Sequence, residues 1–242
     1  MSGPLLEVRD VSRRFGGLLA NAHISISVNT GELVGLIGPN GAGKSTLFNL
    51  IAGALQPTEG RIFFDGQDIT DLPAPQRCAR GIARTFQVVR SFDTMTVLEN
   101  VIVGGFVHTA SPSIARRKAE DALDFTGLSN RADDLASELT PPEKRRLELA
   151  RSLATDPKLL LLDEVMTGLT PSEAQQGVAL VRRIRERGVT ILMVEHVMEI
   201  VMPLVDRAIV LHLGEHLAEG KPADLVRNDK VISAYLGERR RA

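Results

Sequence analysis

Short apolar runs separated by longer amphipathic stretches divide the chain into a regular alternation. Three runs are apolar at almost every position, Leu33–Ile37, Leu159–Leu162 and Thr190–Val194. Such runs are typical of strands that are buried on both faces of a sheet. Ser45–Ala52 has a helical pattern, which Gly53 is expected to end. Strands separated by helices predict an α/β fold with a parallel sheet, and ligands of such sheets bind at the carboxyl ends of the strands.

Other segments do not follow this alternation. Ile24–Val28 alternates between apolar and polar residues, and Arg61–Phe64 runs into the turn Asp65-Gly66. The first pattern predicts a strand, and the second predicts a strand that enters a turn. The stretch from Val97 to Ser152 is helical in pattern and has few strand signals. We expect it to form a helical subdomain inserted into the α/β core.

Composition narrows the possible functions. The 242 residues, of which 43% are hydrophobic, suffice for one large domain or two small ones. Lys and Arg number 29 against 30 Asp and Glu, a balance that argues against nucleic-acid binding. Cys78 is the single cysteine, which fits a reducing compartment. The N-terminus does not resemble a secretory signal, and no apolar run approaches the roughly 20 residues that span a bilayer, so work at a membrane would need a partner.

The strongest chemical motif is the phosphate loop, Gly38-Pro39-Asn40-Gly41-Ala42-Gly43-Lys44-Ser45, between a predicted strand and a predicted helix. Its glycines let backbone N–H groups turn toward phosphate oxygens, and the following helix, which continues with Thr46, adds its positive dipole end. Lys44 supplies charge to the outer phosphates and Ser45 a hydroxyl to Mg²⁺. The alternative is an ordinary glycine-rich turn, which the four fixed motif positions disfavour.

Two carboxylates, Asp163 and Glu164, end the second buried strand and are called the acid pair below. Carboxylates at the end of a buried strand need a cationic partner, and Mg²⁺-ATP is one such partner. Asp163 is the better candidate for holding the metal through water, and Glu164 for activating the attacking water as general base. The alternative is a strand end capped by solvated acids. His196 follows the third buried strand and is placed to reach the γ-phosphate, although a lone histidine there is more often structural.

The order of Phe15, the phosphate loop, Gln87, the acid pair and His196 resembles the nucleotide-binding subunits of ABC transporters. Within that family the chain is most similar to the importers for branched-chain and other hydrophobic amino acids. The segments that carry this closer resemblance are Arg84-Thr85-Phe86-Gln87, Met95-Thr96-Val97-Leu98-Glu99-Asn100, Arg145-Arg146-Leu147-Glu148-Leu149-Ala150-Arg151 and Ala234-Tyr235-Leu236-Gly237.

The resemblance implies a P-loop NTPase fold with a RecA-like parallel core, an antiparallel β subdomain and the helical insertion. The whole chain, 1–242, would be one nucleotide-binding domain, with a core of about 1–87 and 154–242 and a helical subdomain of about 88–153. ATP and Mg²⁺ are the implied ligands, with Ser45, Gln87 and Asp163 at the metal.

The resemblance also assigns roles to single residues. Phe15 would stack on adenine. Gln87 would contact Mg²⁺ or the attacking water and report to the membrane partner. His196 would stabilise the transferring phosphoryl group, so the catalytic set is Glu164, His196 and Gln87.

The chain departs from the family at the signature loop, Leu139-Thr140-Pro141-Pro142-Glu143, where relatives have L-S-G-G-Q. In the family this loop clasps the ATP of the opposite subunit, so Thr140 is the residue expected to contact nucleotide. Thr140 and Glu143 form a predicted capping box with Pro141 at the first helical position, so the helix start is kept. The two prolines have no N–H to offer, and Glu143 brings negative charge toward a phosphate. A second departure is Val165, where relatives usually have proline.

The sequence leaves three functions open. The first is the ATP-hydrolysing subunit of an importer, bound at the cytoplasmic face of the inner membrane to permease subunits, with a second nucleotide-binding subunit and, indirectly, a solute-binding protein. The expected cargo is branched-chain or other hydrophobic amino acids or related small solutes. The second is an ATPase acting on ribosomes or DNA, which the single phosphate loop and near-neutral charge disfavour. The third, suggested by the signature loop alone, is a regulatory subunit with poor turnover. The signature loop also favours a heterodimer over a homodimer.

Overall fold

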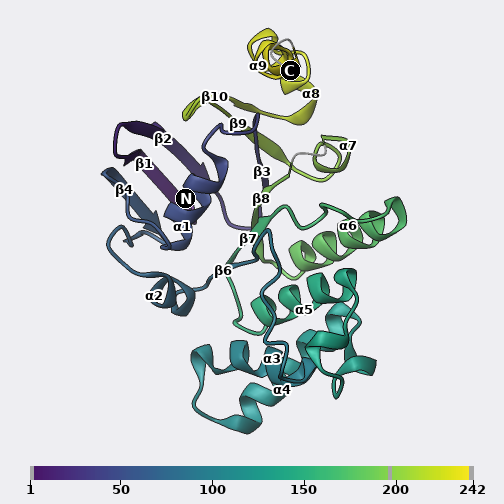
Figure 1. Ribbon diagram of the computed structural model, residues 1–242. Helices are drawn as coiled ribbons and strands as arrows, with labels where there is room; N and C mark the ends of the chain where they lie inside the picture. The colour runs from purple at the N-terminus through teal and green to yellow at the C-terminus, as the bar shows by residue number, and fades with distance from the viewer. Residues whose placement is uncertain (1–2, 196–197, 240–242) are drawn as a thin grey trace. The chain divides into compact units, whose positions relative to one another are not determined.

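The computed structural model describes residues 3–195 and 198–239, and side chains up to residue 235. Its contacts divide the chain into two compact units (Figure 1). The first combines Met1–Ala74 with Ile184–Ala242, and the second is Pro75–Arg183.

The first unit contains a four-stranded antiparallel sheet. Its order is β2-β1-β4-β5, and Leu6 pairs with both Val28 and Phe64. The hairpin between β1 and β2 is closed by the pair Phe15 and Leu18, so β2 begins earlier than the alternation from Ile24 predicts. The expected antiparallel subdomain is confirmed. The strands are β1 Leu6–Phe15, β2 Leu18–Val28, β4 Glu59–Phe64 and β5 Gln67–Asp68.

Parallel pairing forms the centre of the first unit. β3 (Leu33–Ile37) lies between β8 (Thr190–Val194) and β9 (Arg207–His212), parallel to both. Every residue of β3 and β8 is buried, as their continuous apolar sequences predict. β10 (Glu215–Gly220) returns antiparallel beside β9.

Four whole helices lie among the described residues of the first unit. The one after β3 is α1, and Gly53 caps it in the left-handed conformation, φ 77°, as expected. The helices are α1 Lys44–Ala52, α7 Met198–Val201, α8 Pro222–Leu225 and α9 Asp229–Arg239.

The second unit joins two parallel strands to the helical segment. β6 (Ile82–Arg84) pairs with β7 (Leu159–Asp163), with Ala83 opposite Leu160. Its helices are α2 Ala74–Ala79, α3 Val97–Gly105, α4 Pro112–Thr126, α5 Pro141–Leu153 and α6 Pro171–Glu186, and short 3₁₀ turns cover 106–108, 129–131 and 136–138. This unit extends beyond the expected 88–153 insertion, because it also holds β6, β7 and most of α6.

Helices α3, α4 and α5 enclose an apolar core of their own, which confirms the predicted helical segment. The buried residues of that core are Val97, Leu98, Val101, Ala119, Ala122, Leu123, Leu128, Ala136, Leu139, Leu147, Ala150 and Ala154. Within the described part of the chain, none of the helices has the length and apolar character needed to cross a membrane.

Candidate nucleotide-binding and hydrolysis site

The phosphate loop leaves the carboxyl end of β3 and enters α1, as predicted. Two of its glycines are required by their surroundings. A Cβ on Gly38 (φ 148°) would lie 2.1 Å from the carbonyl oxygen of Leu211, and one on Gly43 (φ 94°) would lie 2.5 Å from the amide of Asn21. The loop therefore passes so close to its neighbours that side chains there are excluded.

Helix α1 presents its first turn without a side-chain cap, because its N-cap is Gly43. The ammonium of Lys44 is buried and donates to the carbonyl oxygens of Gly38 at 2.6 Å and Pro39 at 2.8 Å. The loop thus holds a full positive charge at the positive end of a helix. Both features favour an anion with several charges, such as a triphosphate.

Asn21, on β2, is a residue of this site that sequence analysis missed. Its side chain is fully buried, and its amide Nδ2 donates to the carbonyl of Gly43 at 3.2 Å. The backbone N–H of Gly214 donates to the neighbouring carbonyl of Ala42 at 3.2 Å. The phosphate loop is therefore fastened to the hairpin β1–β2 and to the turn between β9 and β10. Polar Asn21 stands out in its strand, but no local pattern assigns it to a loop 22 residues away.

Phe15, the candidate for stacking on adenine, ends β1 with 41% of its surface exposed. The guanidinium of Arg13 lies 4.6 Å from the centroid of its ring. One face of the ring is thus occupied by a cation.

In the second unit the acid pair lies at the end of β7, as predicted, but the cationic partner of Asp163 is a residue of this chain. Arg84 Nη2 contacts Asp163 Oδ2 at 2.9 Å, and both side chains are mostly buried. The backbone N–H of Asp163 donates to the hydroxyl of Thr85 at 3.1 Å. Arg84 thus supplies a cationic partner of the kind that a buried carboxylate at this strand end was expected to need.

Glu164 has a backbone conformation that non-glycine residues rarely adopt, with φ 49°. Its carboxylate accepts a 2.8 Å hydrogen bond from the side-chain amide of Gln87. Two residues that the sequence assigned separately to catalysis are thus brought together. Backbone strain of this kind gathers at active sites, where the surrounding structure holds it.

The signature loop has the predicted capping geometry. Thr140 is the N-cap of α5, and Glu143 accepts from its backbone N–H at 2.9 Å and its hydroxyl at 2.8 Å. These bonds lower the pKa of Glu143, the backbone bond most of all. Arg131, which also pairs with Asp134, contacts the same carboxylate at 2.8 Å, so the negative charge expected to face a phosphate is partly offset inside the chain. The same geometry recurs at the start of α6, where Glu173 accepts from the N–H and hydroxyl of Thr170, each at 2.7 Å.

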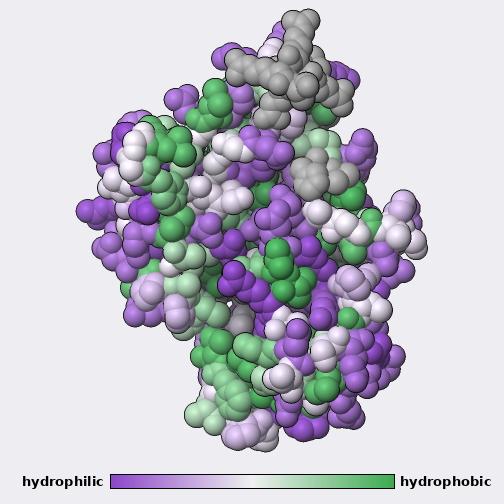
Figure 2. Space-filling view, viewed as in Figure 1, coloured by the Kyte–Doolittle hydropathy of each residue, from purple (hydrophilic) through white to green (hydrophobic). Residues whose placement is uncertain are grey.

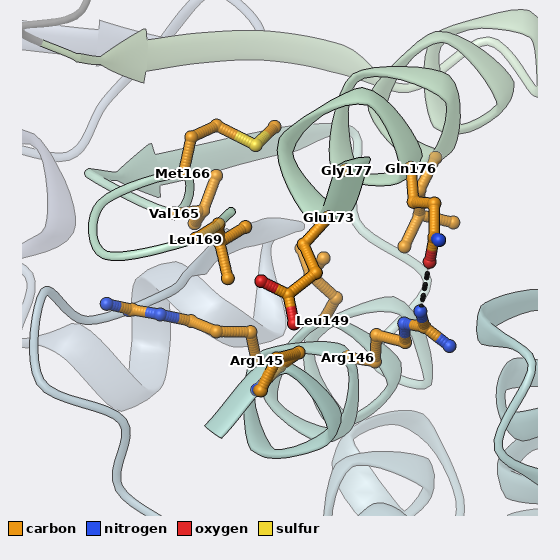
Figure 3. Close-up of a pocket in the computed structure, with 11 residues that line it drawn as sticks. Arg145, Arg146, Leu149, Val165, Met166, Leu169, Glu173, Gln176 and Gly177 are labelled. Atoms are coloured by element: carbon orange, nitrogen blue, oxygen red, sulfur yellow. Dashed lines mark hydrogen bonds between the residues drawn. The ribbon is translucent and has the colours of Figure 1, made fainter. Parts of the chain in front are cut away.

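A pocket lies behind the signature loop, between α5, the loop after β7 and α6 (Figure 3). Figure 3 shows Val165 and Met166 on one side and Arg146 on the other, where Arg146 donates to Gln176 at 2.6 Å. A Cβ on Gly177 would lie 2.6 Å from the sulfur of Met166, so that glycine makes room for Met166. Val165 is buried here, which gives the departure from proline a packing role.

The remaining assignments concern the extent of the site. Phe15 and the phosphate loop belong to the first unit, and Gln87, Thr140 and the acid pair to the second. His196 lies outside the described residues. In the parts of the chain that the structure describes, no group of three or more His, Cys, Asp or Glu side chains could hold a metal ion.

Comparison with known proteins identifies the family of this chain. Residues 22–167 match the family model described as ABC transporter. The chain belongs to the ABC transporter family. It is an ATP-binding subunit of that family, which couples ATP hydrolysis to transport, and the expected P-loop NTPase fold is confirmed.

Individual ABC proteins match over almost the whole chain. The high-affinity branched-chain amino acid transport ATP-binding protein BraF of Pseudomonas aeruginosa is 40% identical over 98% of this chain and 100% of its own length. LivG of Escherichia coli, which has the same descriptive name, is 41% identical over the same shares. Residues 215–240 match a second family model, described as branched-chain amino acid ATP-binding cassette transporter.

Solved structures agree with these relatives. The ADP conformation of MJ1267, an ATP-binding cassette of an ABC transporter, superposes with a TM-score of 0.88 and 34% identity, covering 97% of this chain and 99% of that one. The dimeric structure of MJ0796, a bacterial ABC transporter cassette, has a TM-score of 0.80 and 27% identity over 90% of this chain and 98% of its own. ABC subunits of this kind dimerise and work with membrane permeases.

Proposed function

We propose that this chain energises an importer for branched-chain or other hydrophobic amino acids or related small solutes. The observation that carries the substrate class is the match of residues 215–240 to the branched-chain amino acid cassette model, supported by the names of BraF and LivG. A solute-binding protein would deliver the cargo to the permease and act on this subunit only indirectly. No nucleic acid takes part.

The catalytic roles follow the chemistry of each side chain. Glu164 is the general base toward the attacking water, and Gln87 contacts that water or the metal, a pairing supported by their 2.8 Å hydrogen bond. Lys44 and the backbone of Gly38–Thr46 bind the phosphates, supported by the loop and helix geometry described above. Phe15 stacks on adenine with its face opposite Arg13. His196 stabilises the transferring phosphoryl group.

Mg²⁺ is the metal we propose, held by Ser45, Gln87 and, through water, Asp163. One hydroxyl, one amide and one carboxylate offer only oxygen ligands, which suits a hard cation that keeps several waters and binds phosphates. The ion would supply charge neutralisation on the phosphates. Arg84 holds Asp163 Oδ2, and so fixes the carboxylate that receives the metal's water shell.

We also propose that the working pair is a heterodimer. Thr140 is the signature residue that would reach the opposite subunit's ATP, but Pro141 and Pro142 have no N–H, and the Glu143 carboxylate occupies its own helix start. A partner with an intact glycine signature would complete the ATP site built on this chain's phosphate loop. The same loop supports a second candidate, a regulatory subunit that binds ATP and turns it over poorly.

The permease would bind the helical segment, at the cytoplasmic face of the membrane. Figure 2 shows hydrophobic residues gathered on the surface where Figure 1 labels α3 and α4. Exposed apolar side chains of this unit include Val88, with 76% of its surface accessible, and the partly exposed Phe92, Val103, Phe106, Ile114 and Leu135. Apolar patches of this kind mark protein–protein contacts.

Reconstitution tests these proposals together. The chain would be co-expressed with candidate permease subunits, a second ATPase subunit and a solute-binding protein of the branched-chain amino acid importer family, and the complex placed in proteoliposomes. We expect ATP-driven uptake of leucine, isoleucine or valine, and ATPase activity that the loaded binding protein stimulates. Uptake of an unrelated solute class would reject the cargo, and a complex that hydrolyses ATP equally well without this chain would favour the regulatory role.

A further inference from the structure

Helix α5 carries a buried carboxylate that the proposed mechanism does not use. Glu148 is 2% exposed. Its Oε1 accepts the backbone N–H of Phe86 at 3.0 Å, while Oε2 is buried and has no hydrogen-bond partner among the described residues. Burial raises the pKa of this carboxyl to about 7. A carboxylate in such a place lowers the stability of the fold, since an apolar side chain of the same size would fill the space without the cost of desolvation.

The residue that Glu148 holds is the neighbour of Gln87. Phe86 is fixed from α5 at both backbone atoms, because Arg145 Nη1 donates to its carbonyl oxygen at 3.1 Å. Arg145 and Glu148 are three residues apart and therefore share one face of the helix. The peptide groups on both sides of Phe86, including the one that leads into Gln87, thus have their orientation set by this helix.

Further contacts from the same helix hold the segment on both sides of Gln87. The hydroxyl of Ser152 donates to the carbonyl of Arg84 at 3.3 Å, and Arg151 Nη2 donates to the carbonyl of Arg90. Gln87 itself is exposed, and its side-chain amide donates the 2.8 Å hydrogen bond to Glu164. An exposed side chain keeps one position only if its backbone is held, and small displacements of a group that orients reactants reduce rates strongly.

We propose that Glu148 is a positioning residue for ATP hydrolysis: through the backbone N–H of Phe86 it holds Gln87 against Glu164. This inference rests on the proposed catalytic roles of Gln87 and Glu164. It also connects the signature helix to the water-activating pair, because Glu148 lies on the helix that begins at Pro141.

A matched pair of substitutions separates positioning from packing. Glu148→Gln keeps a side-chain oxygen that can accept the Phe86 N–H, whereas Glu148→Met fills the same space without an acceptor. We expect Glu148→Met to lower kcat about 10-fold, with the dissociation constant for ATP within about twofold of the original chain. Glu148→Gln should stay within about threefold of the original kcat. Glu186→Met, at the exposed end of α6, is the control and should change neither quantity.

Gln87→Ala and the double variant Gln87→Ala/Glu148→Met complete a double-mutant cycle in which kcat is measured. If Glu148 acts through Gln87, the double variant is no slower than Gln87→Ala alone. Additive losses would overturn the proposal, as would a Glu148→Met variant with unchanged kcat, or one that loses its cooperative melting transition and is thereby shown to be structural. Unchanged turnover in Gln87→Ala would instead reject the catalytic role of Gln87, a failure of the proposed function that the cycle separates from failure at Glu148.

Discussion

The side-chain amide of Gln87 donates a 2.8 Å hydrogen bond to the carboxylate of Glu164, across 77 positions of sequence. Gln87 follows β6 and Glu164 ends β7, and these strands are parallel neighbours, so their carboxyl ends bring the two side chains to one edge. A carboxylate can accept the proton of a water molecule, and the amide of Gln87 helps to orient this carboxylate. This arrangement supports the proposed role of the pair in activating the attacking water.

Glu164→Gln is the first prediction. Glutamine occupies the same volume but cannot take a proton, so turnover should fall by roughly 10²–10⁴-fold while ATP binding is retained. ATP should then hold two subunits together as a long-lived pair, detectable by size-exclusion chromatography. Glu173→Gln, which changes a carboxylate that only caps α6, serves as control. Near-normal turnover in Glu164→Gln would remove this residue from the role of base.

The second prediction concerns the binding of the ATP phosphates by Lys44. Lys44 places its charge among the carbonyl oxygens of Gly38 and Pro39, where it acts on bound ATP before any chemistry occurs. Lys44→Ala should therefore weaken ATP affinity as well as hydrolysis, and calorimetry measures the first directly. Lys230→Ala, an exposed lysine on α9, should leave the affinity alone. Equal affinity in Lys44→Ala and the original chain would contradict the assignment.

The third prediction follows from the carboxyl of Glu148, whose pKa burial raises from 4.5 to about 7. The unfolded chain ionises this group near its ordinary pKa, so between pH 4.5 and 7 the folded state binds the extra proton. The stability contributed by that proton is present at low pH and is lost as the pH rises through 7. The free energy of unfolding should therefore fall by at most roughly 3 kcal/mol over this range relative to Glu148→Gln.

Urea unfolding of both proteins at pH 5, 6, 7 and 8 measures this difference. The comparison removes the contribution of all other titrating groups that the two proteins share. Parallel stability curves would show that the carboxyl is not neutral in the folded chain at pH 5–6.

The elements that position the site were predictable because their signals are local. Leu33–Ile37 is apolar at each position, the glycine motif follows it directly, and Gly53 ends the helix. The contacts that orient the side chains of the site were not predictable in this way, because they join residues that are far apart in the sequence. Arg84 and Asp163 are 79 positions apart, and Glu148 and Phe86 are 62 apart. Arg84 and Glu148 are compatible with a solvated surface until the fold buries them, so no periodicity identifies their partners beforehand.

Of the two predictions made for the signature loop, the one on its helix start is correct and the one on the charge of Glu143 is incomplete. The capping box of Thr140 and Glu143 is confirmed, since a helix start is encoded in four consecutive residues. The charge of Glu143 was expected to face a phosphate, but Arg131, twelve residues earlier in the chain, pairs with it. Repulsion of phosphate is thereby reduced, and the missing N–H groups of the two prolines become the main handicap of the loop.

The last prediction tests that handicap. Pro141→Gly, Pro142→Gly and Glu143→Gln together return two N–H donors to the start of α5 and remove the carboxylate that occupies it. Each regained charge-assisted hydrogen bond to phosphate is worth roughly 1.5–3 kcal/mol. If the signature loop limits a pair of identical chains, steady-state ATPase of the purified chain should rise by at least about tenfold.

The triple change also weakens the helix start, because glycines and the loss of the capping carboxylate cost about 1–3 kcal/mol. Glu173→Gln removes the equivalent capping carboxylate from α6, so it measures how much stability a helix start loses with that group alone. The melting temperature is measured for every variant. Arg131→Gln tests the charge of Glu143 separately from the missing N–H donors. It removes the cation that pairs with the Glu143 carboxylate and adds no backbone N–H, so it should slow turnover further. If the original chain alone already turns over rapidly and the triple change leaves its rate unaltered, the two prolines are harmless and the argument for a heterodimer loses its basis.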